Sequence, residues 1–400
     1  MELVWMKDAM SLLLRILFWI AMVGTVTSAI YCGMVVVAAL RFGARKRRAE
    51  KKPEDFLPSV SMLKPLHGAE PGLEQNLTTF FEQEYPEFEL LFCARYESDE
   101  GLQLARRVGS RYPEVRARYL TCGEPKYPNP KMYSLAVMSE AAENDCLVTS
   151  DADCRVRKDY LRRCVQDLKD PKRALSSCLY MGTADVKNLA TELDAVGKSV
   201  EMGSGVLVAD MVEGGTKFAL GVTMILRKKA FYDAGGYDDL GQYQAEDYVL
   251  GKRLAEQGQG VIMSPYVIRL VVPETSFSLS FKNQLRWMQS TRRSRPLGHL
   301  GTGLTFAVPF GLIGLLWGVL AGAPGLGFLW LLASCANRWL QAGVMLRVLG
   351  EPRWVWQTMI YPLRDLLGGV LWFFSYLPGD VYYHGGKYSI APDGRYVEMK

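Results

Sequence analysis

The chain has 400 residues, of which 22% are charged and 49% are hydrophobic, a composition that excludes a wholly disordered protein. Its 47 Lys and Arg residues exceed its 42 Asp and Glu residues by only five, which argues against a dedicated nucleic-acid-binding protein. Eight cysteines occur without a CxxC pair and there are only three histidines, which indicates reduced thiols facing the cytosol rather than a zinc cluster.

The first predicted element is a membrane-spanning helix over residues 16–40, a run of 25 residues without a charge. About 20 apolar residues are enough to cross a bilayer. A cleaved signal peptide is the alternative, but its apolar core would be shorter and followed by small residues. The next segment, 41–52, holds seven basic groups and one acid, which predicts that this flank is cytosolic and that the N-terminus lies outside.

Strand and helix patterns alternate over residues 53–280, which we expect to form a soluble domain. Strand patterns cover residues 59–63, 88–93, 116–121 and 146–150, and helical patterns cover residues 73–81, 101–111, 132–142, 155–168 and 248–257. This alternation predicts a parallel sheet covered by helices, in which ligands bind beyond the carboxyl ends of the strands. Acidic side chains that directly follow a strand are therefore candidates for the site.

Two acidic motifs are candidates for chemistry. Asp151 and Asp153 directly follow the fourth predicted strand. Two carboxylates on such a turn can hold a hard divalent cation, Mg²⁺ or Mn²⁺, that also binds diphosphate oxygens. The alternative is that Asp153 caps the helix expected over residues 155–168. Glu246 and Asp247 open another predicted helix, where an acidic pair is usually structural because it suits the helix dipole.

Basic residues give further candidates. Lys64 and Lys131 lie beside prolines at the ends of predicted elements, where a solvated surface position is an equally good interpretation. Residues 282–295 hold five basic groups and no acid, with Trp287 among them. This segment is compatible with a helix that rests on anionic headgroups, or with Arg286 presented to a phosphate leaving group.

Further membrane contacts are expected in the last third of the chain. Residues 296–337 carry no charge, which is enough for two helices joined by a turn at 321–325. Residues 354–376 are apolar and aromatic but include Arg364 and Asp365. They are expected to form a span with an internal ion pair, or a re-entrant or interfacial helix.

Six segments, in their order along the chain, resemble membrane-bound ceramide glucosyltransferases and their bacterial lipid-glycosylating relatives. They are VSMLKPLHGAEPGLEQNL, NPKMYSLA, TSDADCRV, FALGVTMILRKKAFYDAGGY, QYQAEDYVLGKRLAEQG and NQLRWMQSTRRSRP. The resemblance covers about residues 10–390. It implies an α/β fold in which a GT-A (Rossmann-like) glycosyltransferase domain is inserted between transmembrane helices.

Together with the resemblance, these patterns predict five regions along the chain. They are a transmembrane anchor with a basic cytosolic flank over residues 1–52, a GT-A catalytic domain over 53–280, an interfacial Arg-Trp helix over 281–300, a transmembrane or re-entrant region over 301–380 and a tail over 381–400.

The resemblance also implies roles for the acidic residues. Asp151 and Asp153 match the family's metal and nucleotide carboxylates, and Asp247 in the sequence AEDY matches its catalytic base, with Glu246 beside it. Relatives usually carry an aspartate for the nucleotide after the second strand. This chain departs from that pattern and offers Glu97 or Asp99 there, of which Glu97 is preferred as the contact to uracil.

Among the remaining residues, Arg286 and Trp287 match a terminal Arg-Trp motif at the diphosphate and the acceptor entrance. Lys64 and Lys131 are expected to contact the donor. The family motif begins with Gln or Arg three residues before its arginine. This chain has Asn283 there, and the adjacent Gln284 is expected to substitute through a local shift.

The implied activity is inverting transfer of glucose from UDP-glucose to the hydroxyl of ceramide at the membrane surface. The implied enzyme is a multi-pass membrane protein with a cytosolic catalytic domain, in the inner membrane if the source is bacterial. The alternative is transfer from UDP-N-acetylglucosamine to a hopanoid or other polyol lipid, because such relatives share the KPLHGAEPGL-like segment. A processive polysaccharide synthase would carry more spans, and a catalytically dead binding module would not need both acidic motifs.

Overall fold

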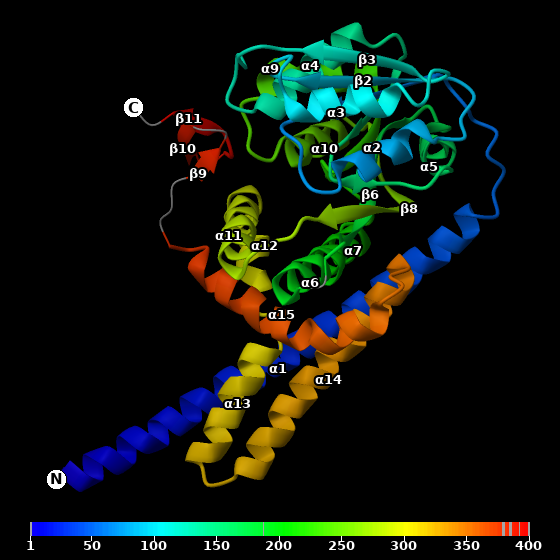
Figure 1. Cartoon of the computed structure of the whole chain (residues 1–400). Helices are drawn as coiled ribbons and strands as arrows, with labels where there is room; N and C mark the ends of the chain where they lie inside the picture. Colours follow the sequence, from blue (N-terminus) through cyan, green and yellow to red (C-terminus); the bar gives the residue numbers. More distant parts are fainter. Residues whose placement is uncertain (1, 187, 378–380, 384–385, 392, 399–400) are drawn as a thin grey trace. The chain divides into compact units, whose positions relative to one another are not determined.

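The computed structural model describes residues 2–186, 188–377, 381–383, 386–391 and 393–398 (Figure 1). The chain divides into two compact units, each assembled from three segments. The unit we call the helical unit comprises residues 1–43, 192–208 and 276–378. The other, the α/β unit, comprises residues 44–191, 209–275 and 379–400.

The α/β unit is built on an eight-stranded sheet with the order β3-β2-β1-β4-β7-β6-β8-β5. Its strands are β1 (Val60–Pro65), β2 (Phe88–Ala94), β3 (Arg116–Thr121), β4 (Cys146–Ser150), β5 (Cys154–Arg155), β6 (Arg173–Ala184), β7 (Thr223–Arg227) and β8 (Gly260–Val272). The first four strands pair in parallel, as the alternation of strands and helices predicts. Because β7 runs antiparallel to both β4 and β6, the sheet as a whole is mixed.

Helices cover this sheet and complete its core. They are α2 (Leu73–Phe81), α3 (Glu100–Gly109), α4 (Pro130–Ala141), α5 (Tyr160–Cys164), the 3₁₀ helix η1 (Val165–Leu168), α8 (Lys228–Asp233), α9 (Gly236–Leu240) and α10 (Glu246–Glu256). Leu63, Leu91 and Leu147 of neighbouring strands are fully buried, and they share one core cluster with Leu135 of α4 and Leu250 of α10. The α/β prediction is therefore confirmed.

The helix predicted over residues 155–168 is wrong at its start. Cys154 and Arg155 form the short strand β5, because they pair with Leu270 and Arg269 of β8. The first helix after this strand, α5, begins only at Tyr160. Asp153 therefore does not cap a helix, which removes the structural alternative for this carboxylate.

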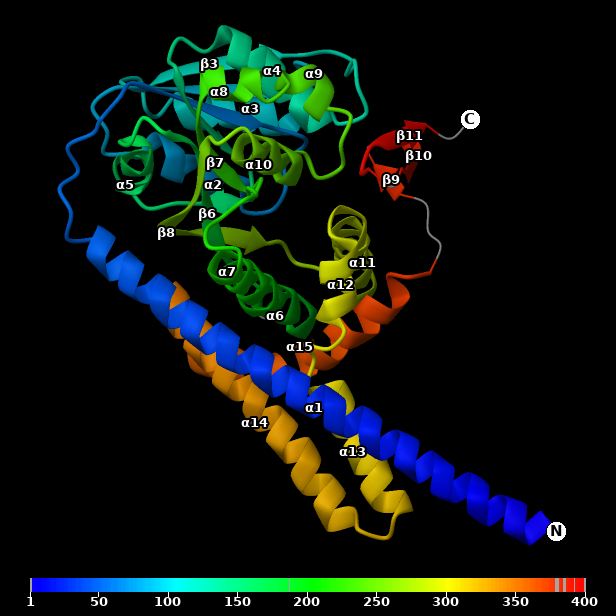
Figure 2. The same ribbon diagram turned by 180° about the vertical axis from the view of Figure 1, so that it is seen from behind.

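Among the described residues, nine helices contribute to the helical unit, and some of them extend beyond it. They are α1 (Glu2–Ala49), α6 (Leu189–Val196), the π-helix η2 (Gly197–Met202), α7 (Gly203–Val212), α11 (Phe277–Ser294), α12 (Pro296–Thr302), α13 (Val308–Leu320), α14 (Pro324–Leu349) and α15 (Trp354–Phe374). As predicted, α13 and α14 form a hairpin around a turn at residues 321–323 (Figures 1 and 2). Glycines allow the two helices to approach closely. A Cβ on Gly318 would lie only 2.6 Å from the Cα of Gly327.

One helix among the described residues is long and apolar enough to cross a membrane by its length and composition, and it covers Ala9–Ala49 of α1. It contains the span predicted over residues 16–40. α13 is apolar but only 13 residues long. The further spans expected over residues 301–380 are not confirmed by this criterion.

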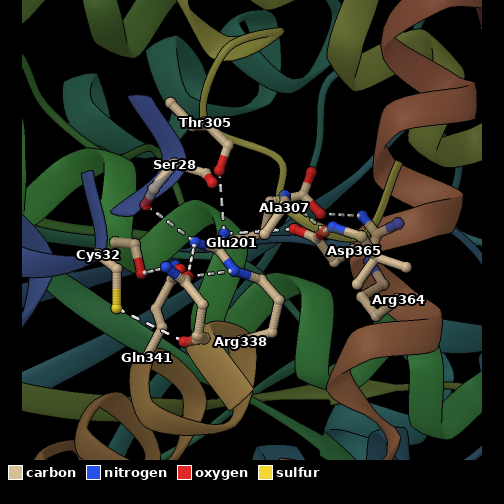
Figure 3. A network of polar contacts seen from close by, with 12 residues as sticks. Ser28, Cys32, Glu201, Thr305, Ala307, Arg338, Gln341, Arg364 and Asp365 are labelled. Carbon is tan, nitrogen blue, oxygen red and sulfur yellow. Dashed lines mark hydrogen bonds and ion pairs between the residues drawn. The ribbon is translucent and has the colours of Figure 1, made fainter. Parts of the chain in front are cut away.

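A buried ion pair joins two helices of the helical unit (Figure 3). Nη1 of Arg338 on α14 lies 3.3 Å from Oδ1 of Asp365 on α15, and both side chains are 2% exposed. The other carboxylate oxygen, Oδ2, accepts hydrogen bonds from the backbone amides of Ala307 at 2.9 Å and Val308 at 2.8 Å. Asp365 therefore accepts hydrogen bonds from amides at the start of α13 and also neutralises the charge of an arginine on α14.

The internal ion pair considered for residues 354–376 does not form. Arg364 instead pairs with Glu201 of η2, with 2.8 Å between Nη2 and Oε2. A Cβ on Gly197 would lie 2.1 Å from Nε of this arginine, so the glycine leaves room for the guanidinium. The segment 192–208 thus belongs to the helical unit and not to the domain predicted over 53–280, because its charged groups find partners far along the chain.

The segment expected to be a tail, residues 381–400, also contains structure. β9 (Val381–Tyr383), β10 (Gly386–Ile390) and β11 (Tyr396–Glu398) form a three-stranded antiparallel sheet. It belongs to the α/β unit.

Candidate active site

A pocket of about 300 Å³ lies at the carboxyl ends of the parallel strands of the α/β unit. Its polar lining comes largely from residues that follow strands, with His67 after β1, Arg95 after β2, and Asp151 and Asp153 after β4. Lys131 joins them from the first turn of α4. The structure therefore places the Asp-x-Asp turn at the sheet edge where parallel strands usually bind ligands.

Lys64 supports the Asp-x-Asp turn from within the core. Its side chain is fully buried, and Nζ donates a hydrogen bond to the backbone oxygen of Asp151 at 2.6 Å. The same ammonium lies 3.5 Å from the ring centroid of Phe80. Burial lowers the pKa of Lys64 to about 8. The contact that the structure shows is thus with the backbone of the turn, and the expected contact with the donor stays a prediction.

Lys131 connects the two acidic motifs. Its Nζ lies 2.6 Å from Oδ1 of Asp151 and 3.8 Å from Oε1 of Glu246, and it donates a hydrogen bond to the backbone oxygen of Gly221 at 3.1 Å. Burial opposes its charge, but the carboxylates of Asp151, Glu246 and Asp247 more than offset burial and raise the pKa of Lys131. The two motifs therefore form one electrostatically coupled site.

The acidic pair begins α10 and is held from both sides. Glu246 is buried, and its Oε2 accepts a hydrogen bond from Nδ2 of Asn129 at 3.1 Å. Asp247 is half-buried, and its Oδ2 accepts a hydrogen bond from the backbone amide of Gly221 at 2.5 Å. Burial raises the pKa of Glu246 to about 7 and also raises the pKa of Asp247, although the neighbouring lysine opposes both shifts.

The donor set of the Asp-x-Asp turn fits a divalent cation that arrives with a diphosphate. Within the described ranges, no group of three or more His, Cys, Asp or Glu side chains is arranged to hold a metal ion. Asp151 and Asp153 both line the pocket and offer hard oxygen ligands. Mg²⁺ in such sites takes one or two carboxylates and completes its octahedron with water and substrate phosphates.

The two alternatives for the uracil contact occupy different positions. Glu97 is not among the residues that line the pocket, and its Oε1 pairs with Nη2 of Arg106 at 2.8 Å on the surface. Asp99 caps α3, and its Oδ2 accepts a hydrogen bond from the amide of Gly68 at 2.9 Å. Gly68 lines the pocket, so the aspartate fixes one wall.

Sequence reasoning missed His67 and Arg95 as pocket residues. Arg95 directly follows β2 and His67 lies two residues after β1, and a position after a strand is the same signal that identified the acidic candidates. A pocket for a diphosphate also needs cationic and polar groups, and strand ends are where they would be found.

The Arg-Trp motif lies on α11 of the helical unit. Lys198 of η2 lies 5.5 Å from the ring centroid of Trp287. Asn283 is exposed whereas Gln284 is half-buried. Side chains three residues apart are neighbours on a helix, so Asn283 lies beside Arg286 and Gln284 lies beside Trp287. The contacts expected for these residues with a diphosphate and an acceptor stay predictions.

Comparison with known proteins identifies the family. The model described as Glycosyl transferase family 21 matches residues 17–396, which is almost the whole chain. The chain belongs to glycosyl transferase family 21.

Three of the similar relatives, each named as a ceramide glucosyltransferase, illustrate the relationship. The family 21 chain is 27% identical to ceramide glucosyltransferase 1 of Caenorhabditis elegans over 257 residues, or 64% of this chain and 54% of the relative. It is 27% identical to ceramide glucosyltransferase 3 of the same organism over 297 residues, or 74% of this chain and 63% of the relative. A ceramide glucosyltransferase of Komagataella phaffii is 34% identical over 113 residues, or 27% and 22% of the two chains. The chain thus spans between half and two thirds of the length of the worm relatives.

Two solved structures are also similar to the family 21 chain. The mannosyltransferase PcManGT from Pyrobaculum calidifontis, in complex with GDP-Man and Mn²⁺, has a TM-score of 0.46 and 18% identity, with 88% of this chain and 99% of that chain covered. S. aureus TarS 1–349, in complex with UDP-GlcNAc, has a TM-score of 0.39 and 12% identity, with 85% and 99% covered.

Proposed function

We propose that this family 21 chain transfers glucose from UDP-glucose to the hydroxyl of ceramide at a membrane surface, with inversion at the anomeric carbon. One observation carries the proposal: Lys131 joins the Asp-x-Asp turn to the acidic pair of α10 beside a pocket at the strand ends. Similarity to relatives named as ceramide glucosyltransferases supports the choice of sugar and acceptor. We also propose that the α/β unit is a GT-A domain.

The pocket is proposed to bind the nucleoside diphosphate sugar. Asp151 and Asp153 would hold Mg²⁺ or Mn²⁺, which, when bound, acts as a Lewis acid that stabilises charge on the leaving diphosphate. Lys131 and Arg95 add positive charge at the same pocket. Glu97 is the proposed contact to uracil.

Asp247 is the proposed general base. A hydroxyl has a pKa far above neutrality and needs a base aimed at its proton. Burial raises the pKa of Asp247 and so strengthens it as a base, while the charge of Lys131 favours its ionised form. The acceptor oxygen bonds to the anomeric carbon as the bond to the diphosphate breaks, and the hydroxyl proton passes to Asp247. One displacement converts an α-linked donor into a β-glycoside, so no covalent intermediate with the protein is required.

The remaining predicted residues have proposed roles at the acceptor side. Glu246 and the base Asp247 both interact with the positive charge of Lys131, so Glu246 is proposed to adjust the pKa of Asp247. Arg286 is proposed to contact the diphosphate and Trp287 the entrance for the acceptor, with Gln284 as the partner that the family places before its Arg-Trp pair.

The helical unit is proposed to hold the enzyme in the membrane, with residues 41–52 and the α/β unit on the cytosolic side. Its α1 is long and apolar enough to span a bilayer. We also propose that the α13–α14 hairpin inserts into lipid. Leu326, Phe328 and Leu329 of α14 are each about 60% exposed, and clustered exposed apolar side chains indicate a membrane or protein contact. An acceptor with acyl chains in the bilayer offers its hydroxyl at headgroup level.

A radiolabelled donor assay tests the proposed function. The purified full chain would be given labelled UDP-glucose or UDP-N-acetylglucosamine with vesicles that contain ceramide or a hopanoid polyol. We expect labelled β-glucosylceramide from UDP-glucose, and its loss in excess chelator. If product formed only from UDP-N-acetylglucosamine and the hopanoid, the proposed substrates would be wrong. Undiminished activity in chelator would overturn the proposed requirement for a metal ion.

A further inference from the structure

The C-terminal end of the chain returns to the loop that precedes the acidic pair. We call residues 393–397 the C-terminal strap. The amide of Tyr396 donates a hydrogen bond to the backbone oxygen of Gln242 at 2.8 Å, and the amide of Gln244 donates to the oxygen of Gly394 at 3.1 Å. A β-bridge pairs the residues between these contacts, residues 243 and 395. The strap thus docks on the loop by its backbone in a defined register.

Side chains reinforce this docking. Nε of Arg395 donates a hydrogen bond to Oη of Tyr243 at 3.0 Å, and its guanidinium lies 5.0 Å from the centroid of the tyrosine ring. Nη2 of Arg395 also lies 3.4 Å from Oδ1 of Asp239. Arg253 of α10 pairs with the same aspartate and donates to the same tyrosine hydroxyl at 3.3 Å. Tyr243, which is buried, is therefore held by an arginine from the strap and another from α10.

A short path leads from Tyr243 to the acidic pair. Nδ2 of Asn129 donates hydrogen bonds to the backbone oxygen of Tyr243 at 3.3 Å and to Oε2 of Glu246 at 3.1 Å. The N-cap position of α10 is Ala245, which has no side-chain oxygen to accept the first amides of the helix. The loop just before α10 is held instead by contacts from elsewhere in the chain, and the strap supplies several of these contacts to residues 242–244.

We propose that the C-terminal strap is a positioning element that, through Arg395 and Tyr243, fixes the start of α10 and so orients Asp247 toward the acceptor. The inference rests on the proposed role of Asp247 as the base. Arg395 touches neither of the acidic motifs and acts through Tyr243, so it is a positioning residue. Asp151, Asp153 and Arg95, which would hold the donor together with Lys131, follow strands of the sheet, so loosening the strap should slow turnover without weakening donor binding.

The test uses the full chain with Arg395→Ala. Arg116→Ala is the matched control, because Arg116 is another exposed arginine that pairs with a carboxylate, Glu143, in the same unit. The loss of the hydrogen bond to Tyr243, the exposed ion pair with Asp239 and the cation–π contact is expected to lower kcat about fivefold. The KM for UDP-glucose should stay unchanged. Hydrogen exchange at the amides of residues 242–248, measured without substrate, should become faster, and the control variant should change none of these.

A second variant separates positioning from general instability. Tyr243→Phe removes the hydroxyl that Arg395 contacts, so the double variant with Arg395→Ala should lose less activity than the two single effects combined. The proposal is overturned if Arg395→Ala matches the Arg116→Ala control in kcat, if the donor KM rises in the same proportion as kcat falls, or if exchange at residues 242–248 is unchanged. Full turnover by Asp247→Asn, measured in parallel, would instead overturn the proposed role of Asp247 as the base. The exchange measurement would still decide the role of the strap.

Discussion

The ammonium of Lys131 lies 2.6 Å from Oδ1 of Asp151, so a lysine neutralises one of the two carboxylates that are proposed to bind a metal ion. The same ammonium is close enough to Glu246 to stabilise its charge. Lys131 therefore couples donor binding and base chemistry through one positive charge, and its removal should affect both.

Replacing Lys131 by Met should move the pH dependence of kcat. Loss of the positive charge raises the pKa of Glu246 and Asp247, since the lysine favours their ionised forms. The base is then protonated up to a higher pH, and the acidic limb of the profile should shift upward by about one unit or more. Rates measured from pH 5 to 9 check this. Lys252→Met, on the exposed side of α10, is the control. If the acidic limb of the Lys131→Met profile stayed at the wild-type pH, the coupling between Lys131 and the acidic pair would be contradicted.

Asp247→Asn should lower kcat about 100- to 10,000-fold, which is the usual contribution of a general base. The amide oxygen still accepts a hydrogen bond from the backbone amide of Gly221, so the local structure should be kept. Binding of UDP-glucose, measured by calorimetry, is expected to stay within about twofold of wild type because Asp247 does not line the donor pocket. Asp233→Asn, an exposed aspartate paired with Lys229, is the control.

Gly221→Ala tests the positioning of the base by its neighbour. A Cβ at this glycine would lie 2.9 Å from Oδ2 of Asp247, so the carboxylate must move. Because a displacement of about 1 Å in a catalytic group can cost about 100-fold, kcat should fall at least tenfold while the protein stays folded. Gly205→Ala is the control, since a Cβ there meets no atom within 4 Å. Wild-type turnover by the Gly221 variant would show that the observed contact is not needed.

The buried pair of Arg338 and Asp365 predicts a non-additive effect on stability. Asp365→Asn leaves a buried arginine without its countercharge, which typically costs about 3–5 kcal/mol. Replacing both residues by apolar ones, Arg338→Met with Asp365→Leu, removes both charges and should cost less than Asp365→Asn alone. Apparent unfolding temperatures of the detergent-purified protein check the order. A double variant less stable than the single one would show that the capping of α13 outweighs the pair.

The first four strands of the α/β unit and the helices between them followed from the sequence, because they are short, regular and separated by turns. The strands β6, β7 and β8 were not predicted. The strand predicted over residues 116–121 and the helix over 73–81 are observed with the same bounds. Strand ends gave the position of Asp151 and Asp153 by the same logic. The helix expected from residue 155 failed because the pairing of Cys154 with β8 joins residues more than a hundred positions apart.

The remaining features depend on contacts between distant segments. Nothing near Lys131 in the sequence indicates that it faces both Asp151 and Glu246. Arg364 and Asp365 are adjacent, yet each pairs with a different helix, since successive side chains on a helix point in different directions. The strap was expected to be part of a tail without regular structure, because its few residues have no apolar periodicity that predicts a contact with another segment.

The carboxylate of Asp365 also couples the assembly of three helices. Synthesis delivers α13 first, then α14 with Arg338, and α15 with Asp365 last. Until residue 365 has left the ribosome, the arginine lacks its countercharge and the first amides of α13 lack their acceptor. The hairpin therefore reaches its final structure only when α15 joins it, so these three helices mature together rather than one after another.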